Sequence, residues 1–243
     1  MEMLTFGAPS ILFGKAIGGK PIEFFRDFIV GYPAVDAALM SESDPTGTFS
    51  ETADRGEWLV TQDAGGTLPV VQDDADGGWI AFTSDGDMDD QMTVQLNGES
   101  FLLARGRRLM YETRLRFDLM TENALWGMSV NTTDPLTTAP SDYIAFNIMA
   151  DGDLLFVSDA ASAGTTATDT GVNLTAATFA TFAFVWDGID TIRAYVNGVK
   201  VYSTTTTIPV GAYLSPFYTV QAVANALTAT VDWIYIANER AAT

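Results

Sequence analysis

A short acidic turn offers the clearest set of metal ligands in the sequence. Asp85, Asp87 and Asp89 occupy every second position of it. Calcium sites need several carboxylate oxygens converging on one point. The turn departs from an EF-hand loop, because Asp90 stands where the sixth residue should be glycine and Leu96 where the twelfth should be glutamate. A solvated turn between two strands is the preferred interpretation, and Ca²⁺ held by the three aspartates is the sharper alternative.

Acid–base and nucleophilic catalysis has few side chains available. The 243 residues include no histidine and no cysteine, which excludes a Ser-His-Asp triad, a Cys-His pair and metal sites built on those ligands. Glycoside hydrolysis requires two cooperating carboxylates. The expected strands carry only single ones, Glu112 and Asp232, with no alternating series on one strand. The sequence therefore predicts that the protein is not an enzyme and uses no cofactor, apart from the calcium alternative.

Positive charge is concentrated in one stretch. Five of the 12 basic residues lie between Arg105 and Arg116. A contact patch for an acidic neighbour is one interpretation. Pairing with carboxylates on adjacent strands is preferred, because exposed ion pairs are common and weak.

Aromatic side chains are a further candidate for ligand binding, since they stack on sugar rings in lectin-like modules. Each of the five tryptophans falls in an expected strand, where aromatic side chains usually fill the core. Placement in the core is therefore preferred for all five, which are Trp58, Trp79, Trp126, Trp186 and Trp233.

The net charge limits the classes of partner. The 31 acidic and 12 basic residues give a net charge of -19, which disfavours binding to the phosphates of nucleic acids. The apolar run at Ile11–Phe13 is far too short to span a membrane. We expect neither a nucleic-acid nor a membrane partner, and synthesis in a cytoplasm.

Short strands separated by turns dominate residues 49–243. Residues 111–117 alternate between Tyr, Thr, Leu and Phe on one face and charged residues on the other. The pair Asn197-Gly198 between two alternating runs predicts a β-hairpin. Residues 131–142 and 160–170 are expected to be surface loops. Such a series predicts one all-β sandwich domain. The expected strands are 58–61, 68–71, 79–83, 92–96, 108–117, 125–130, 143–149, 154–157, 179–186, 191–196, 199–204 and 227–236.

Residues 1–48 form a different segment, apolar but broken by glycines. Apolar residues at i, i+1, i+4 and i+5, with Pro21 before them, predict a short amphipathic helix within an extended N-terminal arm. Such an arm fits a clamp on a partner, and packing back on its own sandwich is the alternative. The candidate partner-binding residues are Phe24, Phe25, Arg26, Phe28 and Ile29.

Several motifs in residues 50–240 are typical of one superfamily. They include the segment Arg193-Ala194-Tyr195-Val196-Asn197-Gly198 before a strand and the final Val231-Asp232-Trp233-Ile234-Tyr235-Ile236. On these residues the chain resembles the concanavalin A-like or laminin-G-like jelly rolls. The resemblance implies a jelly-roll β-sandwich. It brings no calcium or sugar residues of lectins with it, because no matching motif is present.

Within that superfamily, the layout resembles proteins encoded beside capsid genes in tailed bacteriophages. This resemblance implies a virion structural protein on the capsid surface: a decoration or cement protein that binds the major capsid protein through its arm and sandwich. It also implies association with other copies, as a trimer. The alternative is a carbohydrate-binding, lectin-like module of a phage fibre or adhesin. A glycoside hydrolase or lyase is the third hypothesis.

Overall fold

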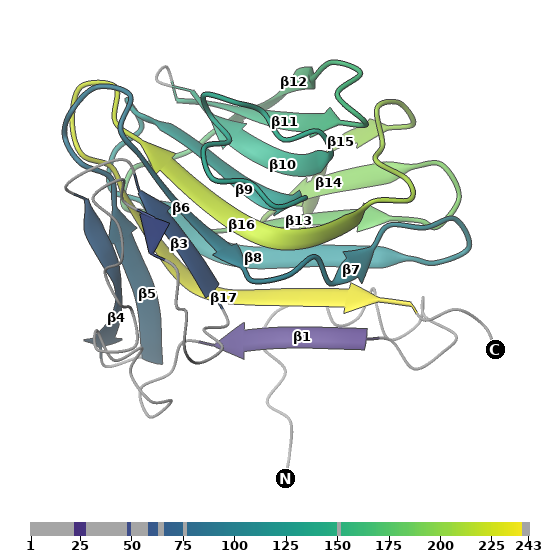
Figure 1. The fold of residues 1–243 in the computed structure, drawn as a ribbon, viewed down its shortest axis with the longest axis horizontal. Helices are drawn as coiled ribbons and strands as arrows, with labels where there is room; N and C mark the ends of the chain where they lie inside the picture. Colours follow the sequence, from purple (N-terminus) through teal and green to yellow (C-terminus); the bar gives the residue numbers. More distant parts are fainter. Residues whose placement is uncertain are drawn as a thin grey trace, which may run out of the picture.

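Two antiparallel β-sheets packed face to face make up the protein (Figure 1). The computed structural model describes residues 22–27, 48–49, 58–62, 66–74, 77–149 and 152–239. The strands of these residues are β1 (Ile22–Asp27), β2 (Thr48–Phe49), β3 (Trp58–Gln62), β4 (Thr67–Asp74), β5 (Gly77–Thr83), β6 (Gln91–Leu96), β7 (Phe101–Leu102), β8 (Leu109–Phe117), β9 (Asn123–Ser129), β10 (Tyr143–Ile148), β11 (Asp153–Asp159), β12 (Thr166–Asn173), β13 (Ala180–Trp186), β14 (Ile192–Val196), β15 (Val199–Thr204), β16 (Tyr213–Gln221) and β17 (Thr228–Asn238).

The strand order places segments that are distant in sequence next to each other. The eight-stranded sheet has the order β15-β14-β13-β8-β17-β5-β4, and β1 pairs with the free edge of β17. The nine-stranded sheet has the order β12-β11-β10-β9-β16-β6-β3-β2, and β7 pairs with β16. Both sheets are mixtures of hairpins and long crossovers, as in a jelly roll. The predicted all-β sandwich is confirmed.

The core lies between the two sheets and is rich in aromatic side chains. The ring of Trp126, 1% exposed, has its centroid 5.1 Å from Phe117, 5.9 Å from Phe146 and 4.9 Å from Phe182. The contacts are tilted, stacked and edge-on, respectively, and they stabilise the core beyond the apolar area that each ring buries. Because the inward residues alternate along each strand, the remaining residues of both sheets are left to form two outer faces.

The tryptophans divide between core and surface. Trp126 and Trp186 are buried in the core, as predicted, and Trp58 packs against it. Trp79 and Trp233 are half-buried and do not belong to the core clusters. Aromatic residues in strands are therefore not all interior ones in this sheet.

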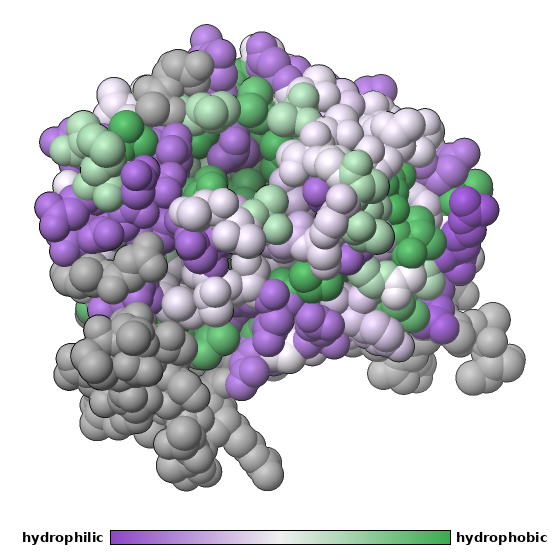
Figure 2. Space-filling model, turned by 45° about the horizontal axis from the view of Figure 1, so that its top comes forward, coloured by the Kyte–Doolittle hydropathy of each residue, from purple (hydrophilic) through white to green (hydrophobic). Residues whose placement is uncertain are grey.

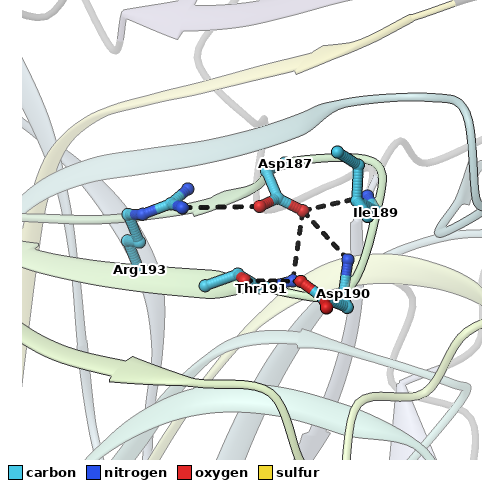
Figure 3. A network of polar contacts seen from close by, with 5 residues as sticks. All are labelled: Asp187, Ile189, Asp190, Thr191 and Arg193. Atoms are coloured by element: carbon cyan, nitrogen blue, oxygen red, sulfur yellow. Dashed lines mark hydrogen bonds and ion pairs between the residues drawn. The ribbon is translucent and has the colours of Figure 1, made fainter.

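The turn between β13 and β14 is closed by a single carboxylate (Figure 3). Asp187 Oδ1 accepts hydrogen bonds from the backbone N–H groups of Ile189 (2.9 Å), Asp190 (3.1 Å) and Thr191 (3.1 Å). Its Oδ2 lies 3.4 Å from the guanidinium of Arg193. Burial alone would raise the pKa of this carboxyl, but the backbone donors and the arginine lower it below its ordinary value.

The structure differs from the sequence-based expectation in three elements. The predicted helix in the arm is wrong, since Ile22–Asp27 is strand β1, paired residue by residue with Trp233–Asn238. The segment expected to be a loop over 160–170 contains the start of β12. The strand β16 was not expected at all. Within the described ranges, no helix is long and apolar enough to cross a bilayer.

Candidate functional site

A row of amide side chains crosses one end of the outer face of the nine-stranded sheet. Gln91 on β6, Gln221 on β16 and Asn123 on β9 lie opposite one another in the strand registers. Asn147 follows on β10, where its Nδ2 donates to the carbonyl of Ala124 at 2.9 Å. Asn147 lies opposite Leu125, two positions along β9 from Asn123, so it continues the row of the other three amides diagonally.

The amides are oriented by one another and by the backbone. Asn123 Nδ2 donates to Gln221 Oε1 at 2.9 Å, and Gln221 Nε2 donates to the carbonyl of Asp89 at 3.3 Å. The side-chain carbonyl oxygens of Asn123 and Asn147 accept no hydrogen bond from any described residue. Both side chains are half-buried. The row therefore presents two fixed acceptors that lack donors.

An apolar patch adjoins the amide row on the same face. It consists of a small buried cluster, against which Leu136 and Leu155 pack. Figure 2, with the top of the first view turned forward, shows hydrophobic groups (green) next to hydrophilic groups (purple) on the surface of the molecule. The five buried members are at most 4% exposed, so the apolar surface that a ligand can contact here comes from the half-buried Leu136 and Leu155. The buried members of the cluster are Leu125, Tyr143, Ala145, Val157 and Phe217.

The loop between β9 and β10, residues 131–142, crosses this face and is held by two glutamines of β6. Gln95, 1% exposed, donates to the hydroxyls of Ser129 (3.1 Å) and Ser215 (3.0 Å) and accepts from the N–H of Thr132 at 3.0 Å. At the other end of β6, Gln91 donates to Asp134 and Thr137 and accepts from the N–H of Leu136. The loop is therefore tied down at both ends of the strand that it crosses.

A buried glutamate fixes the rim next to the amide row, because Glu122 directly precedes Asn123 at the start of β9. The carboxylate of Glu122, 1% exposed, accepts hydrogen bonds from the N–H groups of Val223 and Ala224 and from the amide of Asn225. Burial acts to raise the pKa of Glu122, but these donors lower it below its ordinary value. A charged acceptor with three donors holds the loop before β17 rigidly against the loop before β9.

The acidic turn lies beside this rim. Asp89 N donates to Ala222 O at 2.9 Å, and Ala222 N donates to Asp90 O at 3.1 Å. The carboxylates of Asp85, Asp87 and Asp90 each offer an oxygen within 4.8 Å of the others. Asp89 is exposed, has a φ of 68° and lies outside this group. Asp90 takes the place that the sequence pattern suggested for Asp89.

The chemistry of this group suits a hard cation such as Ca²⁺, which takes oxygen ligands only. With one oxygen from each residue, the three carboxylates supply three of the six to eight oxygens that Ca²⁺ coordinates. Exposed acidic groups also gather in turns without an ion. Calcium at this turn stays a prediction.

The two carboxylates considered for hydrolysis lie on the other sheet. Glu112 of β8 is 3% exposed, and burial raises its pKa to about 8. Asp232 of β17 forms an ion pair with Arg114. Neither side chain reaches the face that carries the amide row.

The predicted partner-binding residues of the arm fall partly within β1. Phe24, Phe25 and Arg26 lie opposite Ile236, Tyr235 and Ile234 of β17, respectively. Phe28 and Ile29 lie outside the described residues. A role of these five positions in binding a partner stays a prediction.

The comparison with family models gives one match. Residues 121–236, slightly less than half of the chain, match a model described as the concanavalin A-like lectin/glucanases superfamily. The matched residues run from the end of the β8–β9 connection to β17 and include the amides Asn123, Asn147 and Gln221. A search of curated proteins finds no match to the sequence.

Solved structures resemble the chain over most of its length. A protein of unknown function from Shewanella oneidensis MR-1 has a TM-score of 0.57 at 14% identity, covering 100% of both chains. A β-glucanase from Bacillus licheniformis has a TM-score of 0.54 at 14% identity, covering 90% of this chain and 98% of the glucanase. An endo-acting O-glycanase of the human gut microbiota has a TM-score of 0.56 at 12% identity, covering 89% and 99%. At such identities the likeness shows the fold.

The comparisons correct one prediction and leave others standing as predictions. The sequence-based exclusion of enzymatic activity is wrong, because glycosidases such as the β-glucanase share this fold. Glycoside hydrolysis needs carboxylates, so the lack of histidine and cysteine does not argue against it. Nothing links the chain to tailed bacteriophages, and the virion location, the capsid partner and the trimer stay predictions. The fold itself is the concanavalin-like jelly roll that glycosidases and carbohydrate-binding proteins also have.

Proposed function

We propose that the outer face of the nine-stranded sheet binds a carbohydrate chain. The observation that carries this proposal is the amide row, where the side-chain carbonyl oxygens of the half-buried residues Asn123 and Asn147 accept no hydrogen bond from the described residues. Sugar hydroxyls supply such donors, and a hydrogen bond that replaces one to water contributes about 0.5–1.5 kcal/mol.

The apolar patch beside the row supports the same class of ligand. A pyranose has polar edges and a face of C–H groups, and Leu155 at the border of the cluster offers apolar surface to that face. The β-glucanase and the O-glycanase with the same fold act on glycans, which adds support from proteins of this shape.

The test is binding of the full chain to arrayed β-glucan oligosaccharides and mucin-type O-glycans, followed by calorimetry on the positive ligands. Asn123→Ala and Asn147→Ala should each lower the affinity about three- to tenfold, as expected for the loss of one hydrogen bond. Asn97→Ala is the matched control, because Asn97 is exposed in the turn after β6, at the other end of the strand.

The same samples are assayed for newly released reducing ends. If reducing ends appear, the protein hydrolyses the glycan as well as binding it. A silent array would contradict the proposal. Equal affinities of the Asn123, Asn147 and Asn97 variants would also contradict it, because the ligand would then lie elsewhere.

A further inference from the structure

Two arginines on the outer face of the eight-stranded sheet are stacked on aromatic rings. The Cζ of Arg114 lies 4.4 Å from the ring centroid of Phe179. The Cζ of Arg116 lies 4.8 Å from the same ring and 4.9 Å from that of Trp79. The two rings are themselves 5.5 Å apart. A guanidinium stacked in this way is held in orientation while its N–H edge stays available to a partner.

The two arginines differ in what their N–H edges contact. Arg114, with a side chain 41% exposed, forms an ion pair with Asp232 at the bulge of β17. Arg116 lies two positions further along β8 on the same face and is half-buried. Within the described ranges, no carboxylate forms an ion pair with it. One guanidinium of the cluster is thus neutralised, and the other is held in orientation with no counter-charge from the part of the chain that the structure describes.

We propose that Arg116 binds the carboxylate of an acidic sugar, in a second carbohydrate site on the sheet opposite the amide row. The planar fork of arginine matches a carboxylate through two parallel N–H···O bonds. The ion pair of Arg114 with Asp232 is an example of a carboxylate bound by an arginine of the same cluster. The half-buried rings of Trp79 and Phe179 beside the fork provide apolar surface for the C–H face of the sugar.

Charge and strand pairing favour this ligand over a protein. Two copies of the chain would repel each other, because each has a net charge of -19. An acidic oligosaccharide has only one or two negative charges. The repulsion from distant carboxylates is screened beyond about 8 Å at physiological ionic strength. An acidic peptide that adds a strand needs an open edge, but the cluster lies on the face of β5, β17 and β8, which are paired with one another.

The site is tested on the full chain by calorimetry with unsulfated oligosaccharides that contain glucuronate and with the same oligosaccharides after reduction of their carboxyl groups. A second arm compares sialyllactose with lactose. We expect at least one of the two carboxylated ligands to bind. Its neutral counterpart should bind at least tenfold more weakly, and the affinity for the carboxylated ligand should fall with added salt. Binding in one arm identifies the source of the carboxylate, and binding in neither overturns the proposal.

Variants separate this site from the amide row. Arg116→Gln should lower the affinity for the carboxylated ligand at least tenfold. Arg105→Gln, which removes the same charge from an exposed loop position, should leave it unchanged. Arg116→Lys keeps the positive charge but lacks the planar guanidinium, so its affinity for the carboxylated ligand should lie between those of the Arg116→Gln and Arg105→Gln variants. Thermal unfolding confirms that each variant is folded. If Arg116→Gln binds as well as the wild type, or if Asn147→Ala is the variant that loses the ligand, the acidic sugar is not bound at this cluster.

Discussion

At the scale of single residues, Glu112 should make stability depend on pH between about 4.5 and 8. Burial raises its pKa from 4.5 to about 8. In this window the unfolded chain ionises Glu112 while the folded protein keeps it protonated, so stability falls as pH rises, by about 1.4 kcal/mol per pH unit. Above pH 8 the loss is complete. Urea unfolding at several pH values should show this decline in the wild type.

Glu112→Gln is the matched variant, because it keeps the shape of the side chain without an ionisable group. Its unfolding free energy should lie increasingly above that of the wild type as pH rises from 5 to 8. Parallel curves for the two proteins would show that Glu112 ionises normally in the folded state.

Asp187 should act in the opposite direction and at lower pH. Its folded pKa is depressed below the ordinary 3.8, so its stabilising effect is present above that value and lost as pH falls through the folded pKa. Asp187→Asn should cost about 1–2 kcal/mol at neutral pH, and the difference from wild type should shrink below pH 3.8. Asp190→Asn, an exposed change in the same turn, is the control for equilibrium unfolding. If the difference in unfolding free energy between wild type and Asp187→Asn stays constant down to pH 2, the lowered pKa of Asp187 is contradicted.

At the scale of elements, the loop 131–142 should depend on Gln95 for its position. Gln95→Ala leaves the hydroxyls of Ser129 and Ser215 and the N–H of Thr132 without their partner, and should cost about 2–3 kcal/mol. Hydrogen exchange of residues 131–138 should accelerate in this variant and not in Asn97→Ala. Unchanged exchange in the loop would mean that Gln91 alone is sufficient to hold it.

Elements with a local signal were predictable, and those that depend on distant partners were not. The hairpin at Asn197-Gly198 is present, with φ angles of 49° and 77° that both residues tolerate. The strand β16 contains Pro216, which argues against a central strand. In the structure this proline falls between the residues that pair with β7 and those that pair with β6.

The error at β1 has a similar cause. Phe24, Phe25 and the apolar residues after them fit a helical spacing, yet aromatic residues also favour strands. The exposed edge of β17 decided between the two by supplying a partner for all six residues of β1. A single sequence does not show which edge is open.

At the scale of the whole molecule, the amide row could not be predicted from the sequence. The carboxylates and arginines stood out by type and spacing, whereas Asn123, Asn147 and Gln221 are ordinary strand residues until the registers place Gln221 opposite Asn123 and Asn147 diagonally beyond it. The order β10-β9-β16-β6 joins segments more than 100 residues apart. Local patterns predict which face a residue takes but not which strands lie beside it.

The pairing of β1 with β17 also leads to a prediction for the molecule as a whole. A chain lacking residues 1–27 should still fold, because β17 remains paired with β8 from Ala229 to Asn238. It should self-associate, since the stretch Trp233–Asn238 becomes an open edge beyond the part that β5 covers. The deletion removes Glu2, Glu23 and Asp27 together with Lys15, Lys20 and Arg26, so the net charge stays at -19 - 0 = -19.

Light scattering across a concentration series measures this association. A chain lacking only residues 1–21 is the control, because it keeps β1 and should behave like the full chain. Association of the shorter chain should increase with salt, which screens the repulsion between copies that each carry a net charge of -19. If the chain without residues 1–27 contains the same number of protomers per particle as the full chain at every concentration and salt level, β1 does not protect this edge. The segment would then be free for the partner contact that the sequence predicted.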